Sequence, residues 1–405
     1  MKHNQQRNTN ILLIGTALSY NQGTAAQALS AYRSLKEFNP SSRFTLISPY
    51  PSSDSKQCAK YGINMINGSL ARLLFHFPSI LREYKRADVI ISLHGDSYSD
   101  DYHAFDIPWL PSSFLPWAQI FWGILLRKPV VIYPQSIGPF KTRLTRFLAR
   151  VALNKTRVIM ARGQITYEYL RGIGIDEARM HLVVDSAFLL EPSPPERVEE
   201  ILSTENINKN TAPLIGMSIS QSIIQFSGFK ERGERRGSYI TLMAQVVDYL
   251  VNKLDATIVF VPSVIGPSKE LDDRIIGHEV FSKVKHKDRV IKITNEYTPE
   301  EFRGVVGHCD LFIGARMHAN IAALSMHVPT IAIGFSHKTP EIMMSVGQDK
   351  YICDIKGVTF EELVSKIDDA WHNREKIRED LESSVKVMRE NLISTIGLIK
   401  QLLSD

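Results

Sequence analysis

Short apolar runs of four to six residues alternate with longer amphipathic stretches along most of the chain. Such runs, when rich in β-branched residues, are typical of buried parallel strands, whereas apolar residues recurring every three or four positions are typical of helices. We also expect a first helix at 24–38. The alternation predicts parallel sheets joined by helical crossovers. In the first half, the expected strands are 11–15, 43–48, 88–92, 130–133, 157–161 and 181–184.

The alternation restarts in the second half after a break. Three prolines at 191–195 and a polar stretch at 203–211 place a linker within 191–211. Two consecutive doubly wound α/β units with a cleft between them are therefore predicted, with bounds 1–195 and 196–356 and a helical segment at 357–405. The expected later elements are strands 214–218, 257–261, 289–293, 310–314 and 330–334, and helices 239–254, 299–309 and 319–326.

Composition narrows the class of protein. A chain of 405 residues exceeds the usual size of one hydrophobic core, which agrees with two domains. Its formal charge of +5 is mildly basic, which suits anionic small molecules or a membrane surface and does not indicate nucleic acid. The three cysteines are far apart and form no CxxC pair, so we expect a reducing compartment and no metal site.

The sequence also predicts a location. Its polar first residues lack the apolar core of a signal peptide, and no run reaches the roughly 18 to 20 apolar residues of a spanning helix, so we expect a cytoplasmic protein. Trp109, Trp117 and Trp122 precede the basic pair Arg127-Lys128. This stretch suits contact with the inner face of a membrane. The alternative is a core helix that leads into the strand at 129–133, followed by a solvated basic helix.

The most informative site candidate follows the apolar run 310–314. Arg316 and His318 come directly after this run, where a strand gives way to a helix. A helix N-terminus favours an anion, a guanidinium suits carboxylate or phosphate, and an imidazole moves protons near neutral pH. His337 and Lys338 follow the next strand, and we expect all four groups to converge. The pattern predicts anion capture beside acid/base chemistry.

Polar residues also follow the strands of the first half. Any one of them can be ordinary turn chemistry, but their recurrence after successive strands predicts a ligand site at the carboxyl edge of the sheet. The first turn is not a G-x-G-x-x-G motif, so a dinucleotide site is not expected. These residues, in chain order, are Asn21, Gly23, His94, Asp96, Ser97, Gln135, Ser136, Arg162 and Asp185.

Taken in order, these segments resemble the polysaccharide pyruvyl transferase family. The resemblance extends over about residues 11–350. Gly163 stands where family members usually carry an acidic residue. The matching segments are Asn21-Gln22-Gly23, Leu93-His94-Gly95-Asp96-Ser97, Gln135-Ser136-Ile137-Gly138-Pro139, Ala161-Arg162, Asp185-Ser186-Ala187-Phe188, Cys309-Asp310-Leu311-Phe312-Ile313-Gly314-Ala315-Arg316-Met317-His318 and Ser336-His337-Lys338.

The resemblance implies a glycosyltransferase-B-like fold and transfer of the enolpyruvyl carbons of phosphoenolpyruvate to a sugar of a cell-surface polysaccharide or its precursor. The product is a pyruvate ketal, phosphate is released, and no metal or other cofactor is needed. His318 is the expected acid/base group, with Asp96 as the base at the acceptor. Donor-binding residues are Arg316, Arg162, Lys338 and His337, and the remaining strand-end residues, Asn21, Gly23, His94, Ser97, Gln135, Ser136 and Asp185, face the acceptor.

Two other functions fit the same residues. A nucleotide-sugar-dependent glycosyltransferase of this fold can use the same arginines to hold a diphosphate. A non-catalytic sugar- or lipid-binding protein is the second alternative, motivated by Gly163 and the tryptophan-rich stretch.

Overall fold

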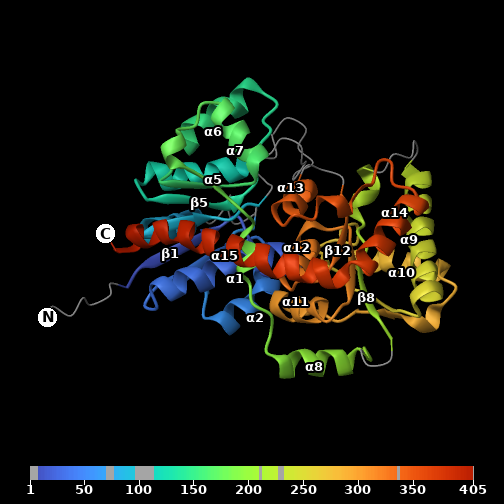
Figure 1. Cartoon of the computed structure of the whole chain (residues 1–405). Helices are drawn as coiled ribbons and strands as arrows, with labels where there is room; N and C mark the ends of the chain where they lie inside the picture. The colour runs from blue at the N-terminus through green and yellow to red at the C-terminus, as the bar shows by residue number, and fades with distance from the viewer. Residues whose placement is uncertain are drawn as a thin grey trace. The chain divides into compact units, whose positions relative to one another are not determined.

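The computed structural model describes residues 8–69, 77–95, 114–208, 212–226, 232–334 and 338–404 of the chain (Figure 1). These residues form two compact units. Unit 1 comprises Met1–Ser19, Thr24–Ser186 and Arg389–Asp405, and unit 2 comprises Tyr20–Gly23 and Ala187–Met388. The domain bounds expected from the sequence stay a prediction, because compactness describes packing and not independent folding.

Unit 1 is built on a seven-stranded parallel sheet in the order β3-β2-β1-β4-β5-β6-β7. Its strands are β1 (Asn10–Ile14), β2 (Arg43–Ser48), β3 (Asn64–Asn67), β4 (Val89–Ser92), β5 (Val130–Gln135), β6 (Val158–Arg162) and β7 (Met180–Val183). Its helices are α1 (Gln22–Phe38, whose first two residues belong to unit 2), α2 (Pro51–Tyr61), α4 (Phe77–Arg86), α5 (Phe114–Leu125), α6 (Arg143–Leu153), α7 (Gln164–Gly172) and the last part of α15 (Arg374–Ser404).

The helices of unit 1 cover both faces of its sheet. Right-handed crossovers place helices that connect strands in one direction on one face and those of the reverse direction on the other. Accordingly, α5, α6 and α7 lie on one side of the sheet and α1 and α2 on the other (Figure 1). Trp117 of α5 is 2% exposed and packs into the core, with its ring centroid 5.5 Å from that of Phe140.

Unit 2 repeats this design with a six-stranded parallel sheet in the order β10-β9-β8-β11-β12-β13. Its strands are β8 (Leu214–Ser218), β9 (Thr257–Phe260), β10 (Val290–Lys292), β11 (Leu311–Gly314), β12 (Thr330–Gly334) and β13 (Ile352–Asp354). Its helices are α8 (Pro195–Thr204), α9 (Arg232–Leu254), α10 (Asp273–Lys283), α11 (Pro299–Gly307), α12 (Met317–Ser325), α13 (Lys338–Ser345), α14 (Phe360–His372) and the first part of α15 (Arg374–Ser404).

Close packing around the middle of the unit 2 sheet depends on small residues. A Cβ atom on Gly216 of β8 would lie 2.7 Å from the Phe312 ring and 2.8 Å from the Cys309 sulfur, so only glycine fits there. Helix α11 begins with a capping box in which Thr298 and Glu301 satisfy each other's backbone N–H groups. Capping residues of this kind set where a helix begins, and the apolar strands form the sheet against which the helices pack.

The α/β fold class predicted from the alternation is confirmed, with two parallel sheets and a helical C-terminal segment. Helix α8 occupies part of the segment 191–211 that was expected to be a linker, because Pro195 stands at the first helical position, where its fixed φ is favourable. The alternative interpretation of the tryptophan-rich stretch as a core helix is confirmed for α5, in which Trp117 and Ile120 are buried, whereas Trp109 lies outside the described residues. Searching the described residues for a helix long and apolar enough to span a bilayer finds none.

Both sheets have a topological switch point, where the order of strands reverses. It lies between β1 and β4 in unit 1 and between β8 and β11 in unit 2. In doubly wound sheets, ligands bind at the carboxyl ends of the strands that flank such a point. Arg316 and His318 follow β11, and His94 follows β4, so the leading candidates lie at switch points.

Candidate active site

The guanidinium of Arg316 is held by a buried carboxylate that the sequence did not single out. Arg316 is the N-cap residue of α12, and its side chain is 19% exposed. Its Nε and Nη2 donate to the two carboxylate oxygens of Asp273, at 3.1 and 2.7 Å. Among the described residues, Nη1 donates to no partner. One edge of the guanidinium is therefore fixed, and the other is available to an anion.

Asp273 is the first residue of α10 and its side chain is fully buried. Besides Arg316, the backbone N–H groups of Gln221 and Val264 donate to its carboxylate, both at 3.1 Å. Burial raises the pKa of Asp273, and Arg316 and the two N–H donors oppose that shift. Asp273 thus ties the loops after β8 and β9 to Arg316.

His318 packs against the backbone of Gly23, which belongs to unit 2 although it precedes the rest of that unit by more than 160 residues. A Cβ atom on Gly23 would lie 2.1 Å from His318 Cγ and 2.5 Å from His318 Cβ. The side chain of Asn21 accepts a hydrogen bond of 2.9 Å from the Gly23 N–H, so Asn21 caps α1. Gly23 therefore provides space for the imidazole, a contact that explains its residue type.

Near the turn from β11 into α12, several buried polar atoms have no hydrogen-bond partner among the described residues. They are the hydroxyls of Ser218 and Ser220 and both amide atoms of Asn320. Ser218 pairs in register with Gly314, and the Asn320 amide fills the space beside Gly314. Buried polar groups normally find hydrogen-bond partners, so these atoms are ready to accept a ligand or water. Lys338, buried to 8% exposure, begins the neighbouring helix α13.

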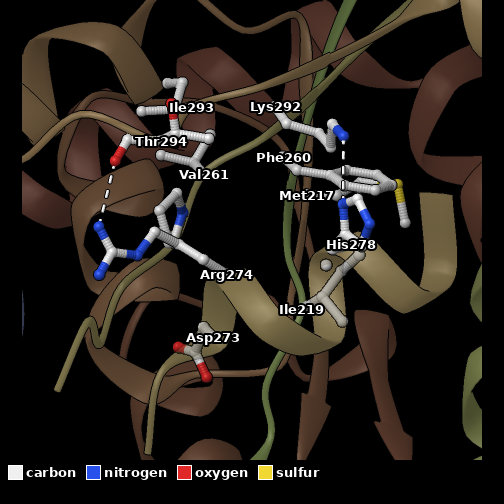
Figure 2. Close-up of a pocket in the computed structure, with 12 residues that line it drawn as sticks. Met217, Ile219, Phe260, Val261, Asp273, Arg274, His278, Lys292, Ile293 and Thr294 are labelled. Carbon is white, nitrogen blue, oxygen red and sulfur yellow. Dashed lines mark hydrogen bonds between the residues drawn. The ribbon is translucent and has the colours of Figure 1, made fainter. Parts of the chain in front are cut away.

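A pocket of about 70 Å³ opens next to Asp273, over the carboxyl ends of β8, β9 and β10. This volume is well above the roughly 10–15 Å³ that a single water needs. Figure 2 shows Arg274 on one side, donating to the Thr294 carbonyl oxygen at 3.1 Å, and His278 on the other, 3.4 Å from Lys292 Nζ. The apolar walls come from Met217, Ile219, Phe260, Val261, Pro262 and Ile293.

In unit 1, Arg162 at the end of β6 forms a buried ion pair. Its Nη1 donates to the Asp185 carboxylate at 2.6 Å, and Nε and Nη2 donate to the Ser136 hydroxyl at 3.2 and 3.0 Å. Gln27 of α1 donates to the same Asp185 oxygen at 2.9 Å. The structure thus brings three predicted residues together. The next residue, Gly163, has a φ of +88°, a conformation that favours glycine and disfavours an acidic residue.

His94 lies in a second polar chain of unit 1. Its Nδ1 is 3.0 Å from the Ser92 hydroxyl and its Nε2 is 2.8 Å from the Gln119 side-chain oxygen. Gln135 donates to Ser92 at 3.4 Å and so joins the chain. Burial lowers the pKa of His94 to about 4, which keeps the imidazole neutral near pH 7. This histidine is suited to hydrogen bonding and not to proton donation.

The sequence-predicted residues therefore fall into two groups, one in each unit. Asn21, Gly23, Arg316, His318 and Lys338 belong to unit 2, and His94, Gln135, Ser136, Arg162 and Asp185 belong to unit 1. Asp96, Ser97 and His337 lie outside the described residues. Residues that sequence reasoning missed are Asp273, Asn320, Gln27 and Gln119, all polar side chains on helices.

Sequence comparison identifies relatives. The sequence profile of the polysaccharide pyruvyl transferase family matches residues 21–337, most of the chain. The amylovoran biosynthesis protein AmsJ of Erwinia amylovora is 20% identical over 324 residues, which cover 80% of this chain and 74% of AmsJ. The matched region contains both groups of candidate residues up to His337.

Solved structures share the fold at low sequence identity. A glycosyltransferase from Rickettsia africae has a TM-score of 0.62 at 14% identity, covering 98% of this chain and 99% of its own. HepE from Anabaena, in a complex with UDP and glucose, has a TM-score of 0.60 at 13% identity, with 98% and 100% coverage. The UDP-GlcNAc 2-epimerase of Methanocaldococcus jannaschii has a TM-score of 0.58 at 12% identity, covering 89% of this chain and 92% of its own. The predicted glycosyltransferase-B-like fold is confirmed.

Proposed function

The chain belongs to the polysaccharide pyruvyl transferase family, and on that premise we propose that it transfers the enolpyruvyl carbons of phosphoenolpyruvate to a sugar, forming a pyruvate ketal and releasing phosphate. The acceptor in this proposal is a sugar of a cell-surface polysaccharide, such as an exopolysaccharide, or its lipid-linked precursor. The reaction takes place in the cytoplasm or at the inner face of the membrane.

The observation that carries this proposal is the arrangement of Arg316 and His318 at the unit 2 switch point. Asp273 fixes one edge of the guanidinium and leaves Nη1 for an anion. The first backbone N–H groups of α12 add partial positive charge beside it. Phosphoenolpyruvate carries both a carboxylate and a phosphate, so it matches a site with one guanidinium, one helix N-terminus and Lys338 as a third positive group.

In the proposed reaction, protonated His318 gives its proton to the methylene carbon of phosphoenolpyruvate, which becomes a methyl group. Positive charge then develops at C2, and a sugar hydroxyl adds there. Phosphate leaves with the electron pair of its C–O bond, stabilised by Arg316 and Lys338. A second hydroxyl closes the ketal. Of the two hydroxyl protons, one restores His318 and the other leaves on phosphate, so the reaction needs no further reactant.

The acceptor groups of the proposal are those of unit 1. Gln135 and Ser136 offer an amide and a hydroxyl, and Asp96 is the proposed base that takes the proton of the attacking sugar hydroxyl and passes it to the departing phosphate. A direct donor contact by Arg162 stays a prediction, as do the donor contact of His337 and the role of Asp96 as the base at the acceptor. In the structure the Arg162 charge is balanced by Asp185, an arrangement that favours a positioning role for this arginine.

The experiment is an assay of the purified protein with phosphoenolpyruvate and a panel of sugar acceptors, following phosphate release. Wild-type protein is expected to release phosphate only when both substrates are present. Arg316→Ala and His318→Ala are each expected to lower kcat/KM by at least 100-fold, the scale on which charge stabilisation and proton transfer act. Wild-type turnover in either variant would refute the assignment.

A nucleotide-sugar glycosyltransferase is the second candidate, favoured by the pocket beside Asp273. Its apolar walls and polar rim suit a flat ring such as a base, and the related HepE structure contains UDP. Release of a nucleoside diphosphate from a sugar nucleotide, with no phosphate release from phosphoenolpyruvate, would favour this function. Acceptor binding in calorimetry without turnover of either donor would instead indicate a non-catalytic sugar- or lipid-binding protein.

A further inference from the structure

One long stretch of the chain is free of acidic residues. The 61 residues from 107 to 167 contain no aspartate or glutamate, whereas the chain average of 43 in 405 would give about six. The same stretch has nine basic residues, and seven of them are exposed. The exposed cations are Arg127, Lys141, Arg143, Arg146, Arg150, Lys155 and Arg157.

Helix α6 presents apolar side chains outward among these cations. Its inner side is formed by Thr145, Ala149, Ala152 and Leu153, all buried. At 3.6 residues per turn, Phe147 stands on the side opposite the core, and Leu144, Arg143 and Arg150 lie within about 60° of it. Phe147 is 61% exposed and Leu144 is 65% exposed. An aromatic ring at the outermost position of a surface helix is unusual, because that position normally carries polar groups.

Helix α5 continues this surface. It packs against α6, and its outer side borders an open groove of about 620 Å³. Leu125 at the end of α5 is 69% exposed, and Arg127 and Lys155 are the charged residues of the groove. The apolar lining consists of Ala118, Phe121, Trp122, Ile124 and Leu125. Apolar side chains bordered by cations thus extend over two adjacent helices.

Acidic residues of the flanking helices do not neutralise this surface. Glu168 of α7 pairs with Arg171 and accepts a hydrogen bond from Gln164. Glu83 of α4 pairs with Arg86 at 3.0 Å. Because each of these carboxylates already has a basic partner on its own helix, the cations of α6 keep their net positive charge.

We propose that the outer surface of α5 and α6, termed the α5–α6 face, binds the surface of an anionic lipid bilayer. Phe147, Leu144 and Leu125 would enter the interface, and the surrounding arginines and lysines would contact lipid phosphates. The α5–α6 face includes Trp122 of the tryptophan-rich stretch that was expected to contact a membrane, but not Trp117, which is a core residue. Under the proposed function, this contact would bring the enzyme close to a lipid-linked acceptor. Binding to the bilayer itself requires no donor and no turnover.

The test measures sedimentation of the purified full-length protein with large unilamellar vesicles. Vesicles of phosphatidylcholine alone are compared with vesicles that contain phosphatidylglycerol, at low and at high salt. Each cation near an anionic surface contributes about fivefold in binding. We expect binding to the anionic vesicles only, weakened at high salt, and reduced by more than tenfold in Arg143→Glu/Arg146→Glu and in Leu144→Ser/Phe147→Ser.

Met344→Ser/Val387→Ser is the matched control, because these side chains are 64% and 55% exposed but lie in unit 2. It is expected to bind as the wild type does, and thermal unfolding verifies that all variants are folded. The proposal is overturned if the wild type does not bind anionic vesicles at low salt, or if the control variant loses as much binding as the α5–α6 variants. It is also overturned if Leu144→Ser/Phe147→Ser converts a dimer into a monomer in sedimentation velocity, because a second copy would then cover this face.

Discussion

Replacing Gly23 by alanine tests the close packing of the candidate acid/base residue. The added Cβ would lie 2.1 Å from His318 Cγ, whereas ordinary contacts begin near 3.4 Å, so the two must separate by at least 1.3 Å. Removing the imidazole does not relieve the conflict, since His318 Cβ itself is only 2.5 Å away. The first turn of α12 must therefore shift, and Arg316 and His318 shift with it.

A displacement of about 1 Å in an active site lowers rate by about 100-fold, and overpacking costs roughly 1–3 kcal/mol of stability. We therefore expect Gly23→Ala to lose about 100-fold in kcat/KM for phosphoenolpyruvate. The free energy of unfolding, measured with urea, is expected to fall by about 1–3 kcal/mol. Assays are made well below the melting temperature, so that the loss of activity does not reflect unfolded protein.

Gly397→Ala is the matched control. Gly397 lies within α15, and an added Cβ there meets nothing within 4 Å. Alanine in a helix is favoured over glycine by about 0.5–1 kcal/mol, so this variant is expected to be as active as the wild type and slightly more stable. If Gly23→Ala retains wild-type kcat/KM, the packing of His318 against Gly23 has no part in catalysis and the reasoning fails.

Two further predictions concern buried titratable groups. Asp273→Asn removes one partner of the buried ion pair with Arg316, so we expect the free energy of unfolding to fall by about 3 kcal/mol and kcat/KM to fall as well. Asp272→Asn keeps the helix cap and loses only the partly exposed ion pair with Arg274, so its free energy of unfolding is expected to fall by no more than about 1 kcal/mol. Equal urea midpoints for the two variants would contradict this. His94 has its pKa lowered from 6.5 to about 4, so below pH 6.5 the unfolded chain takes up a proton that the folded chain does not. Stability should therefore fall by about 2 kcal/mol from pH 7 to pH 5, and this component should be missing in His94→Gln; the same pH dependence in both proteins would show that His94 is not buried as the neutral form.

The sequence predicted the central strands well because their residues are buried on both faces. The expected strands 43–48 and 330–334 coincide with β2 and β12. Two of the four edge strands, β3 and β13, were missed, whereas the edge strands β7 and β10 were predicted. The residues of β3 are only partly buried or exposed and include two asparagines, so this strand gives little apolar signal.

For the site, sequence reasoning found the residues that directly follow strands and missed those that hold them. Asp272 and Asp273 are identical neighbours, yet Asp272 caps α10 and Asp273 is buried against Arg316. No local pattern distinguishes them, because the partner is 43 residues away in the chain. The contact between Gly23 and His318 is likewise set by tertiary packing, which a single sequence does not encode locally.

The central claim is that phosphoenolpyruvate is the donor and that His318 protonates its methylene carbon. The most direct measurement is the reaction of phosphoenolpyruvate with a sugar acceptor in D₂O, followed by mass spectrometry and NMR of the product. We expect a pyruvate ketal whose methyl group carries one solvent deuterium, with no product from His318→Gln. A ketal without deuterium, undiminished product from His318→Gln, or glycosyl transfer from a sugar nucleotide in place of ketal formation would contradict the account.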